Sequence, residues 1–309
     1  MTVTQKDGSS VNDYTTKNGS SSRTEKDKNG KSVTDIRLEK ADLQDTAKDK
    51  AHNLPMPAIS AGIDTTVKIS DMGGQETLRV SIPVENAGPG TVAVKMNTDG
   101  SSEVVSGTVY GDKAVSFTAE KGVTYKICDN AAEFADVTAD AWYRNAVDYI
   151  TARGIMNGTS DTAFSPDRTT SRGMIVTMLY RMENNPEAAA KAVFSDVESG
   201  QYYADAVAWA SEKGIVTGYG DGTFRADDPI TREQLTAILY RYADSPKTEG
   251  TLDLFTDRES VSGYAADAMV WAVKNSIMNG KGDGILDPKG NASRAHAAQI
   301  LMNFFQQET

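Results

Sequence analysis

The chain has 309 residues, of which 39% are hydrophobic and 24% charged, a composition typical of a soluble globular protein with two or three domains. Its net charge of −11 argues against non-specific binding to nucleic acid, which depends on a basic surface. Because no run of 18 apolar residues occurs, the sequence predicts no membrane insertion. The only cysteine, Cys128, excludes an intramolecular disulfide, and we expect it to be a small buried hydrophobic residue.

The negative charge lies mainly after residue 130, where 25 acidic residues face 16 basic ones, against 18 and 16 before it. The first residues have neither a basic segment nor an apolar core, so no secretory signal peptide is predicted. We therefore expect either a cytosolic protein or the C-terminal part of a longer exported chain. An acidic chain with almost no cysteine suits a bacterial surface protein.

Residues 1–52 are polar and carry one motif at a period of 11 residues. The copies are Lys6-Asp-Gly, Lys17-Asn-Gly and Lys28-Asn-Gly. Asp-Gly and Asn-Gly favour type I′ turns, because both central residues of such a turn need positive φ. We predict a β-hairpin repeat or spacer whose apolar content is too low for a strong core. The regular register also suggests the end of a longer array.

Residues 53–130 change to short alternating segments separated by Gly-containing turns. This spacing predicts a small antiparallel β-sandwich-like domain. No catalytic or metal-binding signature occurs in it. The candidate strands are Thr66–Ile69, Thr77–Val84, Thr91–Asn97, Ser102–Tyr110, Ala114–Thr118 and Thr124–Cys128.

Three copies of one helical unit follow, at residues 133–190, 193–248 and 254–309. They open with Phe134-Ala-Asp-Val, Phe194-Ser-Asp-Val and Phe255-Thr-Asp-Arg, 60 and 61 residues apart. Each copy predicts an Ala-rich helix, a glycine-containing loop closed by an apolar anchor, and a second helix with one apolar stripe. A repeat of this length indicates copies that stack on one another, because each has too small a core alone. The second helices begin after the N-cap residues Ser171, Thr231 and Ser293.

These features resemble S-layer homology domains, which typically occur as a tandem set of three in bacterial cell-surface proteins. The second copy matches best, through its opening Phe194-Ser-Asp-Val, Tyr203, Gly214-Ile-Val-Thr-Gly, Asp221-Gly-Thr-Phe and Ile230-Thr-Arg-Glu. The resemblance covers Phe134 to the end of the chain. It implies an all-α pseudo-threefold trimer of helix-loop-helix repeats behind the β part.

The resemblance also implies the function. Such domains anchor a larger protein at the bacterial cell surface or cell wall by non-covalent binding of wall glycan in grooves between repeats. The ligand is often a pyruvylated secondary cell-wall polysaccharide. The expected partner is therefore this anionic polymer or another peptidoglycan-linked glycan.

The residues themselves offer a physical basis for such a site. Arg172, Arg232 and Arg294 each directly follow an N-cap, where free backbone N–H groups and the positive end of the helix dipole suit a carboxylate. Arginine binds a carboxylate through two parallel hydrogen bonds. The alternative for each arginine is a structural salt bridge to an acid of a neighbouring repeat. The predicted ligand-binding set comprises Arg172, Arg232, Arg294, the caps Ser171, Thr231 and Ser293, the loop residues Gly220, Asp221 and Gly222, and the aromatic residues Tyr143 and Tyr203.

Aromatic residues before the first helices are candidates for stacking on sugars, and packing in the repeat core is the equal alternative for each. Besides Tyr143 and Tyr203 they include Trp142, Tyr202 and Tyr264. The family acid after the arginine is missing in the first and third repeats. We therefore expect the groove that uses Arg232 to bind best.

Other functions are less well supported by the residues. Two histidines, His52 and His296, and the lack of a Gly-x-Ser-x-Gly, P-loop or His-Glu-x-x-His motif predict no enzymatic activity. Neither a cofactor nor a metal site is predicted. A calcium-binding structural repeat stays open because Asp-Gly loops recur, although the acids at EF-hand spacing are absent. Self-association into a self-assembling S-layer lattice is the other open alternative.

Overall fold

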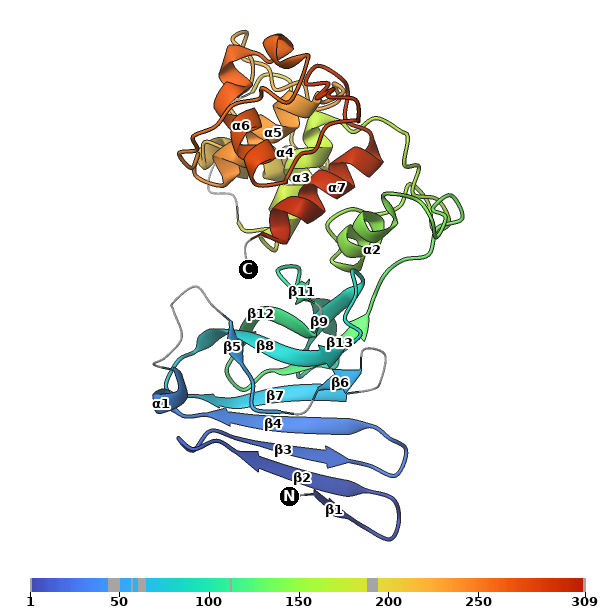
Figure 1. Cartoon of the computed structure of the whole chain (residues 1–309), viewed down its shortest axis with the longest axis vertical. Helices are drawn as coiled ribbons and strands as arrows, with labels where there is room; N and C mark the ends of the chain where they lie inside the picture. Colours follow the sequence, from blue (N-terminus) through green and yellow to red (C-terminus); the bar gives the residue numbers. More distant parts are fainter. Residues whose placement is uncertain are drawn as a thin grey trace. The chain divides into compact units, whose positions relative to one another are not determined.

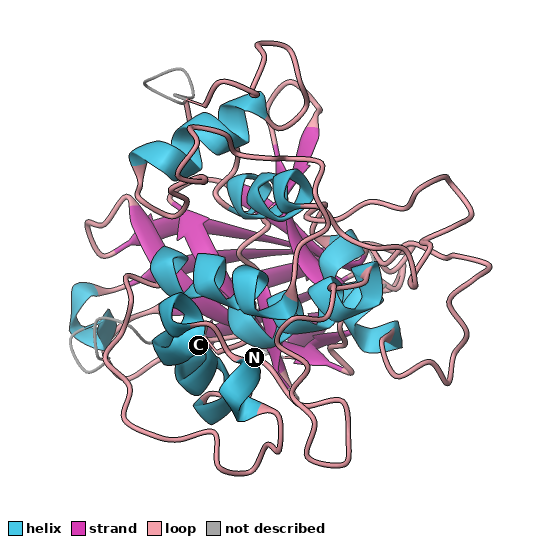
Figure 2. Ribbon diagram, turned by 90° about the horizontal axis from the view of Figure 1, so that it is seen from above, coloured by secondary structure: helices cyan, strands magenta, loops and turns pink. Residues whose placement is uncertain are grey.

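The computed structural model describes residues 2–43, 51–56, 58–60, 65–111, 113–187 and 194–307. The chain divides into two compact units (Figure 1). The β unit comprises Met1–Ala132 with Thr151–Gly154, and the helical unit comprises Glu133–Ile150 and Ile155–Gln307. Short helices joined by long loops build the helical unit (Figure 2).

Two sheets form the β unit, which also holds the short helix α1 (Lys40–Leu43). The first sheet has the strand order β1-β2-β3-β4-β7-β13-β9-β10, and the second has β11-β12-β8-β5 with β6 beside β8. The strands are β1 (Thr2–Thr4), β2 (Ser10–Thr15), β3 (Ser21–Lys26), β4 (Ser32–Leu38), β5 (His52–Asn53), β6 (Ile59–Ser60), β7 (Thr65–Met72), β8 (Thr77–Glu85), β9 (Thr91–Met96), β10 (Ser102–Val104), β11 (Val109–Gly111), β12 (Ala114–Glu120) and β13 (Thr124–Asp129).

Strand β4 joins the two parts of the chain that the sequence separates at residue 52. It pairs in parallel with β7, so strands β1 to β4 share one sheet with strands of the segment that follows. Alternate side chains of β4 are buried, and Ile36 and Leu38 pack in the same core as Val67 and Ile69. The prediction of a separate spacer is therefore corrected, because β4 is part of the larger β unit. The apolar residues Ile36 and Leu38 lie on the strand that meets the core.

The hairpins of residues 1–38 are present, but their turns differ from the prediction. Gly8, Gly19 and Gly30 have positive φ, whereas the Asp or Asn before each glycine does not. The N–H of Gly8 donates to the carbonyl of Gln5, and the N–H of Gln5 to that of Ser9. These are three-residue loops with a type I turn and a left-handed glycine, so the prediction of type I′ turns is wrong.

Most candidate strands of residues 53–130 are present within one or a few residues of the predicted ends. The segment Ser102–Tyr110 is the exception, because it is divided between β10 in one sheet and β11 in the other. Phe117 and Tyr125 meet in the core with ring centroids 4.8 Å apart. Cys128 is half-buried rather than buried, and burial raises the pKa of its thiol.

Each repeat of the helical unit contributes two helices. The helices are α2 (Arg144–Ala152), α3 (Arg172–Met182), α4 (Ala204–Glu212), α5 (Arg232–Tyr242), α6 (Ala266–Lys274) and α7 (Arg294–Phe305), with 3-10 turns η1 (Arg258–Ser260) and η2 (Gly263–Ala265). The predicted caps of the second helices are confirmed, since Ser171, Thr231 and Ser293 each accept the N–H three residues on. The end of the first repeat, the start of the second and the last two residues of the third lie outside the described residues.

The three repeats are joined in a closed cycle of backbone hydrogen bonds. The N–H of Thr170 donates to Ala292, that of Ala292 to Ile230, and that of Ile230 to Thr170, at 2.8–2.9 Å. Second helices pack on first helices of the next repeat, α3 on α4 and α5 on α6. The cycle gives the repeats equivalent surroundings, while pseudo-threefold symmetry as such stays a prediction.

Candidate functional site

The aspartate of each opening motif fixes the anchor of its own loop. Asp257 accepts the N–H groups of Leu286 and Asp287 at 2.9 and 2.7 Å. The Leu286 bond contributes most to lowering the pKa of the Asp257 carboxyl. Repeats 1 and 2 have the same arrangement: Asp136 binds Phe164 and Ser165, and Asp196 binds Phe224 and Arg225. The anchor carbonyls are thereby held in place.

Each anchor carbonyl accepts a hydrogen bond from an arginine of another repeat. Arg232 donates its Nε–H to the carbonyl of Leu286 at 3.1 Å and its Nη2–H to that of Asn279 at 2.7 Å. In the same way Arg172 donates to Phe224, and Arg294 to Phe164 and Asn157. The three predicted arginines therefore occupy equivalent positions and link the repeats in a second cycle.

All three guanidinium groups are buried, with 8%, 3% and 5% of Arg172, Arg232 and Arg294 exposed. Burial lowers the pKa of each, yet an arginine stays protonated in proteins. Within the described part of the chain none of them forms an ion pair with a carboxylate. The alternative of a structural salt bridge is therefore wrong, and the direct hydrogen bonds of these guanidinium groups go to backbone carbonyls.

The backbone N–H groups at the helix starts are not free, which corrects the predicted anion site. In α5 the N–H of Arg232 donates to Gly290 and that of Glu233 to Pro288, at 2.9 and 3.0 Å. The next N–H, of Gln234, is capped by Thr231. In α3 and α7 the first two N–H groups likewise bind loop carbonyls of another repeat. Chain crossings between repeats satisfy these donors, and the cap side chains are used as well.

A groove opens beside each arginine, and the three grooves share one plan. Each is walled by the loop and second helix of one repeat, with an arginine from a second repeat and an aromatic residue from the third. We number the grooves by the repeat that supplies the helix. Groove 1 contains Asn157, Met174, Met178, Arg181, Arg294 and Tyr202; groove 2 contains Tyr219, Gly220, Gln234, Arg241, Arg172 and Tyr264; groove 3 contains Lys281, His296, Gln299, Asn303, Arg232 and Trp142.

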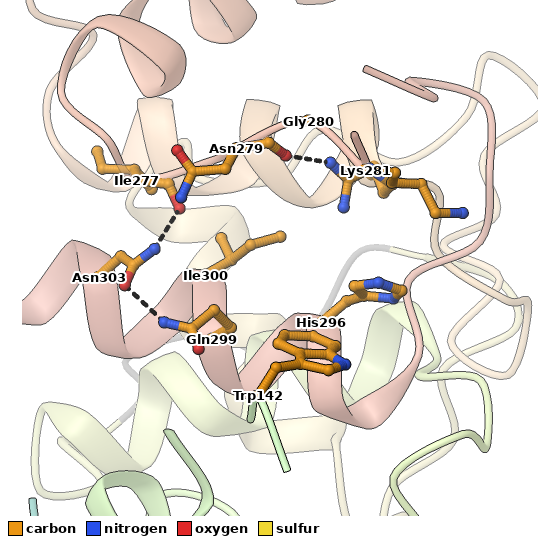
Figure 3. Close-up of a pocket in the computed structure, with 10 residues that line it drawn as sticks. Trp142, Ile277, Asn279, Gly280, Lys281, His296, Gln299, Ile300 and Asn303 are labelled. Carbon is orange, nitrogen blue, oxygen red and sulfur yellow. Dashed lines mark hydrogen bonds between the residues drawn. The ribbon is translucent and has the colours of Figure 1, made fainter. Parts of the chain in front are cut away.

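Groove 3 is the largest of these three, with a cavity volume of about 500 Å³ against 340 Å³ for groove 2 and 160 Å³ for groove 1. Figure 3 shows Trp142 beside His296, with Lys281 across the opening. A chain of amide hydrogen bonds runs from Gln299 to Asn303 to the carbonyl of Ile277.

The aromatic residues at the groove openings are Trp142, Tyr202 and Tyr264, which are 56–59% exposed. Tyr203 is instead buried and Tyr143 half-buried, and neither lines one of the three grooves. The sequence held a signal that the first of the two adjacent aromatic positions, and not the second, lines the groove. The third repeat keeps an aromatic residue only at the first of the two positions, where Tyr264 is followed by Ala265.

The predicted loop residues divide between groove and turn. Gly220 lines groove 2, while Asp221 closes its own turn. Its carboxylate accepts from the side chain and N–H of Thr223 and from Arg225, and these bonds lower the pKa of Asp221 to about 2. Gly222 has a φ of 81°, which favours glycine. The described residues contain no group of three or more His, Cys, Asp and Glu placed to hold a metal ion.

Glu233, which sequence reasoning noted only as the family acid, positions one of the aromatic residues. Its buried carboxylate accepts hydrogen bonds from Ser262, from the hydroxyl of Tyr264 and from Lys289. Gly173 stands at the equivalent place of repeat 1, where a Cβ would lie 3.2 Å from the ring of Tyr203. Glu233 therefore has hydrogen-bond donors beside it, whereas Gly173 has an aromatic ring beside it that leaves little room for a larger side chain.

Comparison with known proteins matches the three repeats to one family. The S-layer homology domain family matches residues 133–173, 193–236 and 254–298. Amylopullulanase of Thermoanaerobacterium thermosulfurigenes is 32% identical over 261 residues, which are 81% of this chain and 14% of that protein. Exoglucanase XynX of Acetivibrio thermocellus is 33% identical over 184 residues, 58% of this chain and 17% of that protein.

A third relative is the S-layer protein sap of Bacillus anthracis, which is 29% identical over 183 residues, 58% of this chain and 22% of that protein. The chain thus spans less than a quarter of the length of these relatives. In the described part of the chain, no helix combines the length and the apolar character needed to cross a bilayer.

Three helical repeats that close one cycle and share one groove plan define a tandem-repeat module. The chain carries three tandem S-layer homology domains, as predicted from its repeats. The family and the S-layer relatives indicate an anchoring module at the cell surface.

Proposed function

We propose that the helical unit anchors the protein to the cell wall by binding an anionic wall glycan in grooves 1 to 3. The ligand class follows from the family resemblance and includes pyruvylated secondary wall polysaccharide. The module itself performs no chemistry in this proposal.

One observation carries the proposal: each groove contains a buried guanidinium group without an ion pair among the described residues. An unpaired buried charge is costly, so a ligand carboxylate that reaches it gains more than at an exposed arginine. Arg232 uses two of its five N–H donors for carbonyls, which leaves donors for a ligand. Hydrogen bonds to charged groups contribute about 1.5–3 kcal/mol each.

The exposed aromatic residues supply the second kind of contact. Trp142, Tyr202 and Tyr264 each lie at the opening of a groove whose arginine comes from another repeat. A sugar ring that stacks there would present a carboxylate substituent to the guanidinium group. Three such sites on one polymer give avidity beyond that of any single groove.

The grooves are expected to differ in affinity, with the Arg232 groove strongest. It has the largest volume, and its anchor is Leu286, so no ring of the described residues stacks on Arg232. In the other grooves the guanidinium carbon of Arg172 lies 4.8 Å from the ring centroid of Phe224, and that of Arg294 4.6 Å from Phe164. These rings occupy part of the guanidinium surface.

Retention on purified wall sacculi tests the proposal. We expect Trp142→Ala to weaken retention most and Tyr264→Ala and Tyr202→Ala less, because Trp142 lines the groove that is expected to bind best. Tyr14→Ala is the matched control, since Tyr14 is a tyrosine of the β unit with 52% exposure. Equal losses from the three groove variants would contradict the ranking, and no loss from any of them would contradict the grooves as the site.

A further inference from the structure

The three grooves differ in the number of guanidinium groups that line them. Nine residues after the buried arginine, repeats 1 and 2 carry Arg181 and Arg241, whereas repeat 3 carries Asn303. The side chains occupy equivalent places, because each donates to a backbone carbonyl, of Ile155, Ile215 or Ile277 respectively, at 3.2–3.5 Å. Grooves 1 and 2 therefore contain two guanidinium groups and groove 3 contains one.

Among the three grooves, groove 3 alone is lined by a histidine. The position two residues after the buried arginine is Met174 in groove 1, Gln234 in groove 2 and His296 in groove 3. The Nδ1 of His296 lies 3.0 Å from the hydroxyl of Ser293. Its ring centroid is 5.4 Å from that of Trp142, and Figure 3 shows the two rings side by side at the groove.

We propose that His296 makes groove 3 a pH-dependent anion site, in which protonation supplies the second positive charge that grooves 1 and 2 carry permanently. This inference rests on the proposed function, because it concerns the same ligand in the same groove. Lys281 does not replace the missing charge, since its ammonium group is paired with Asp287 at 2.7 Å.

The surroundings of His296 favour the neutral imidazole in the empty groove. Burial lowers its pKa, and the charges of Arg232 and Lys281 lower it further, while Asp287 and Asp167 act in the opposite direction. A ligand anion placed between Arg232 and the imidazole would reverse this balance. The face of the Trp142 indole also favours a cation, so binding and protonation support each other.

The sign of the effect follows by linkage. The pKa of His296 is higher in the ligand-bound groove than in the empty groove. The affinity is therefore greatest at pH values below the pKa of His296 in the empty groove, and it falls as pH rises towards and through the pKa of His296 in the bound groove. Each unit of difference between the two values changes the affinity by a factor of about ten. A carboxylate ligand stays ionised from pH 5 to 8, since its own pKa is near 4.

Retention of the full chain on wall sacculi at pH 5 to 8 tests the inference. Groove 3 is isolated by Tyr202→Ala and Tyr264→Ala, and His296 is compared with His296→Gln, which places the repeat 2 residue in this groove. We expect retention to be several-fold stronger at pH 5 than at pH 8, and the dependence to be flat in His296→Gln. Parallel pH profiles of the two proteins would overturn the inference.

A converse variant and a direct titration complete the test. Asn303→Arg gives groove 3 the second guanidinium, so it should raise retention at pH 8. Because the chain has two histidines, His52→Gln leaves one imidazole signal for NMR titration with polymer released from sacculi. The pKa of His296 should rise on binding, and an unchanged or lower value would overturn the inference. If the protein is retained on sacculi but His296→Gln changes nothing, only this inference is contradicted. If the protein is not retained at any pH, the proposed function is contradicted as well.

Discussion

Each buried arginine joins two repeats with one part of its guanidinium group and faces a groove with the rest. Arg232 binds the carbonyls of Leu286 and Asn279 and also lines groove 3. Structure and binding are therefore coupled at these three residues, and replacing an arginine alone does not separate the two effects. Aromatic residues at the openings separate them better, because their side chains are exposed.

Thr170 lies at the centre of the cycle with no exposed surface, and its hydroxyl has no hydrogen-bond partner among the described residues. Repeats 2 and 3 have Ile230 and Ala292 in the cycle. We predict that Thr170→Val raises the free energy of unfolding by about 1 kcal/mol, because an unsatisfied buried hydroxyl is removed.

Tryptophan fluorescence during denaturant unfolding measures this change, since Trp142, Trp209 and Trp271 all lie in the helical unit. Thr236→Val is the matched control. Thr236 is equally buried, but its hydroxyl donates to the carbonyl of Arg232 at 2.8 Å, so this variant should lose stability. A loss of stability in both variants would contradict the prediction for Thr170.

The carboxyl of Asp257 makes the stability of the helical unit depend on pH. Its pKa is lowered in the folded protein, so its contribution is present above the unfolded pKa near 3.9 and is lost as pH falls through the folded value. Asp257→Asn should destabilise the protein at pH 7 by about 1–2 kcal/mol, the cost of weakening bonds to two backbone N–H groups.

Thermal unfolding between pH 2 and 7 measures this difference. The difference in melting temperature between the wild type and Asp257→Asn should narrow below pH 4, because the carboxyl is protonated first in the unfolded chain and, at lower pH, in the folded protein. Asp283→Asn, at an exposed loop position, should behave as the wild type. A difference in melting temperature that stays constant down to pH 2 would show that the charge of Asp257 contributes nothing to stability.

At the scale of elements, contacts between repeats decide what each short helix does. Glu233 in the first turn of α5 holds the entry to α6 through Ser262 and Tyr264. Only 4% of its side chain is exposed. We predict that Glu233→Ala lowers the free energy of unfolding by about 2 kcal/mol, because several hydrogen bonds to a charged group are lost.

The same variant should weaken wall binding through groove 2, because Tyr264 loses the partner of its hydroxyl. Denaturant unfolding and retention on sacculi give the two readouts. Glu259→Ala, whose side chain is 90% exposed, is the control and should change neither. An unchanged free energy of unfolding in Glu233→Ala would contradict the role of this contact.

The helices, their caps and most strands were predictable because their signals are local. Thr231 and Gln234, for instance, form the capping box that their spacing predicts. The partners of the first N–H groups of each second helix were not predictable, because these groups donate to carbonyls that lie 50 or more residues away in the sequence. The N–H of Glu233, for example, donates to the carbonyl of Pro288. For the two adjacent aromatic positions the sequence does hold a signal, in the third repeat, where Tyr264 is followed by Ala265.

At the scale of the whole molecule, three repeats form three grooves only because the cycle is closed. Each groove takes its helix, arginine and aromatic residue from three different repeats, so removing one repeat disrupts all of them. The β unit has its own core. Its β4 strand contributes Ile36 and Leu38 to that core, which the polar composition of residues 1–52 concealed.

The central claim is that the grooves bind an anionic polymer of the cell wall. The most direct measurement is retention of the full chain on purified sacculi before and after chemical removal of the secondary polymer. We predict strong retention before removal and loss of retention afterwards, with competition by the released polymer. Equal retention on intact and stripped sacculi would contradict the claim.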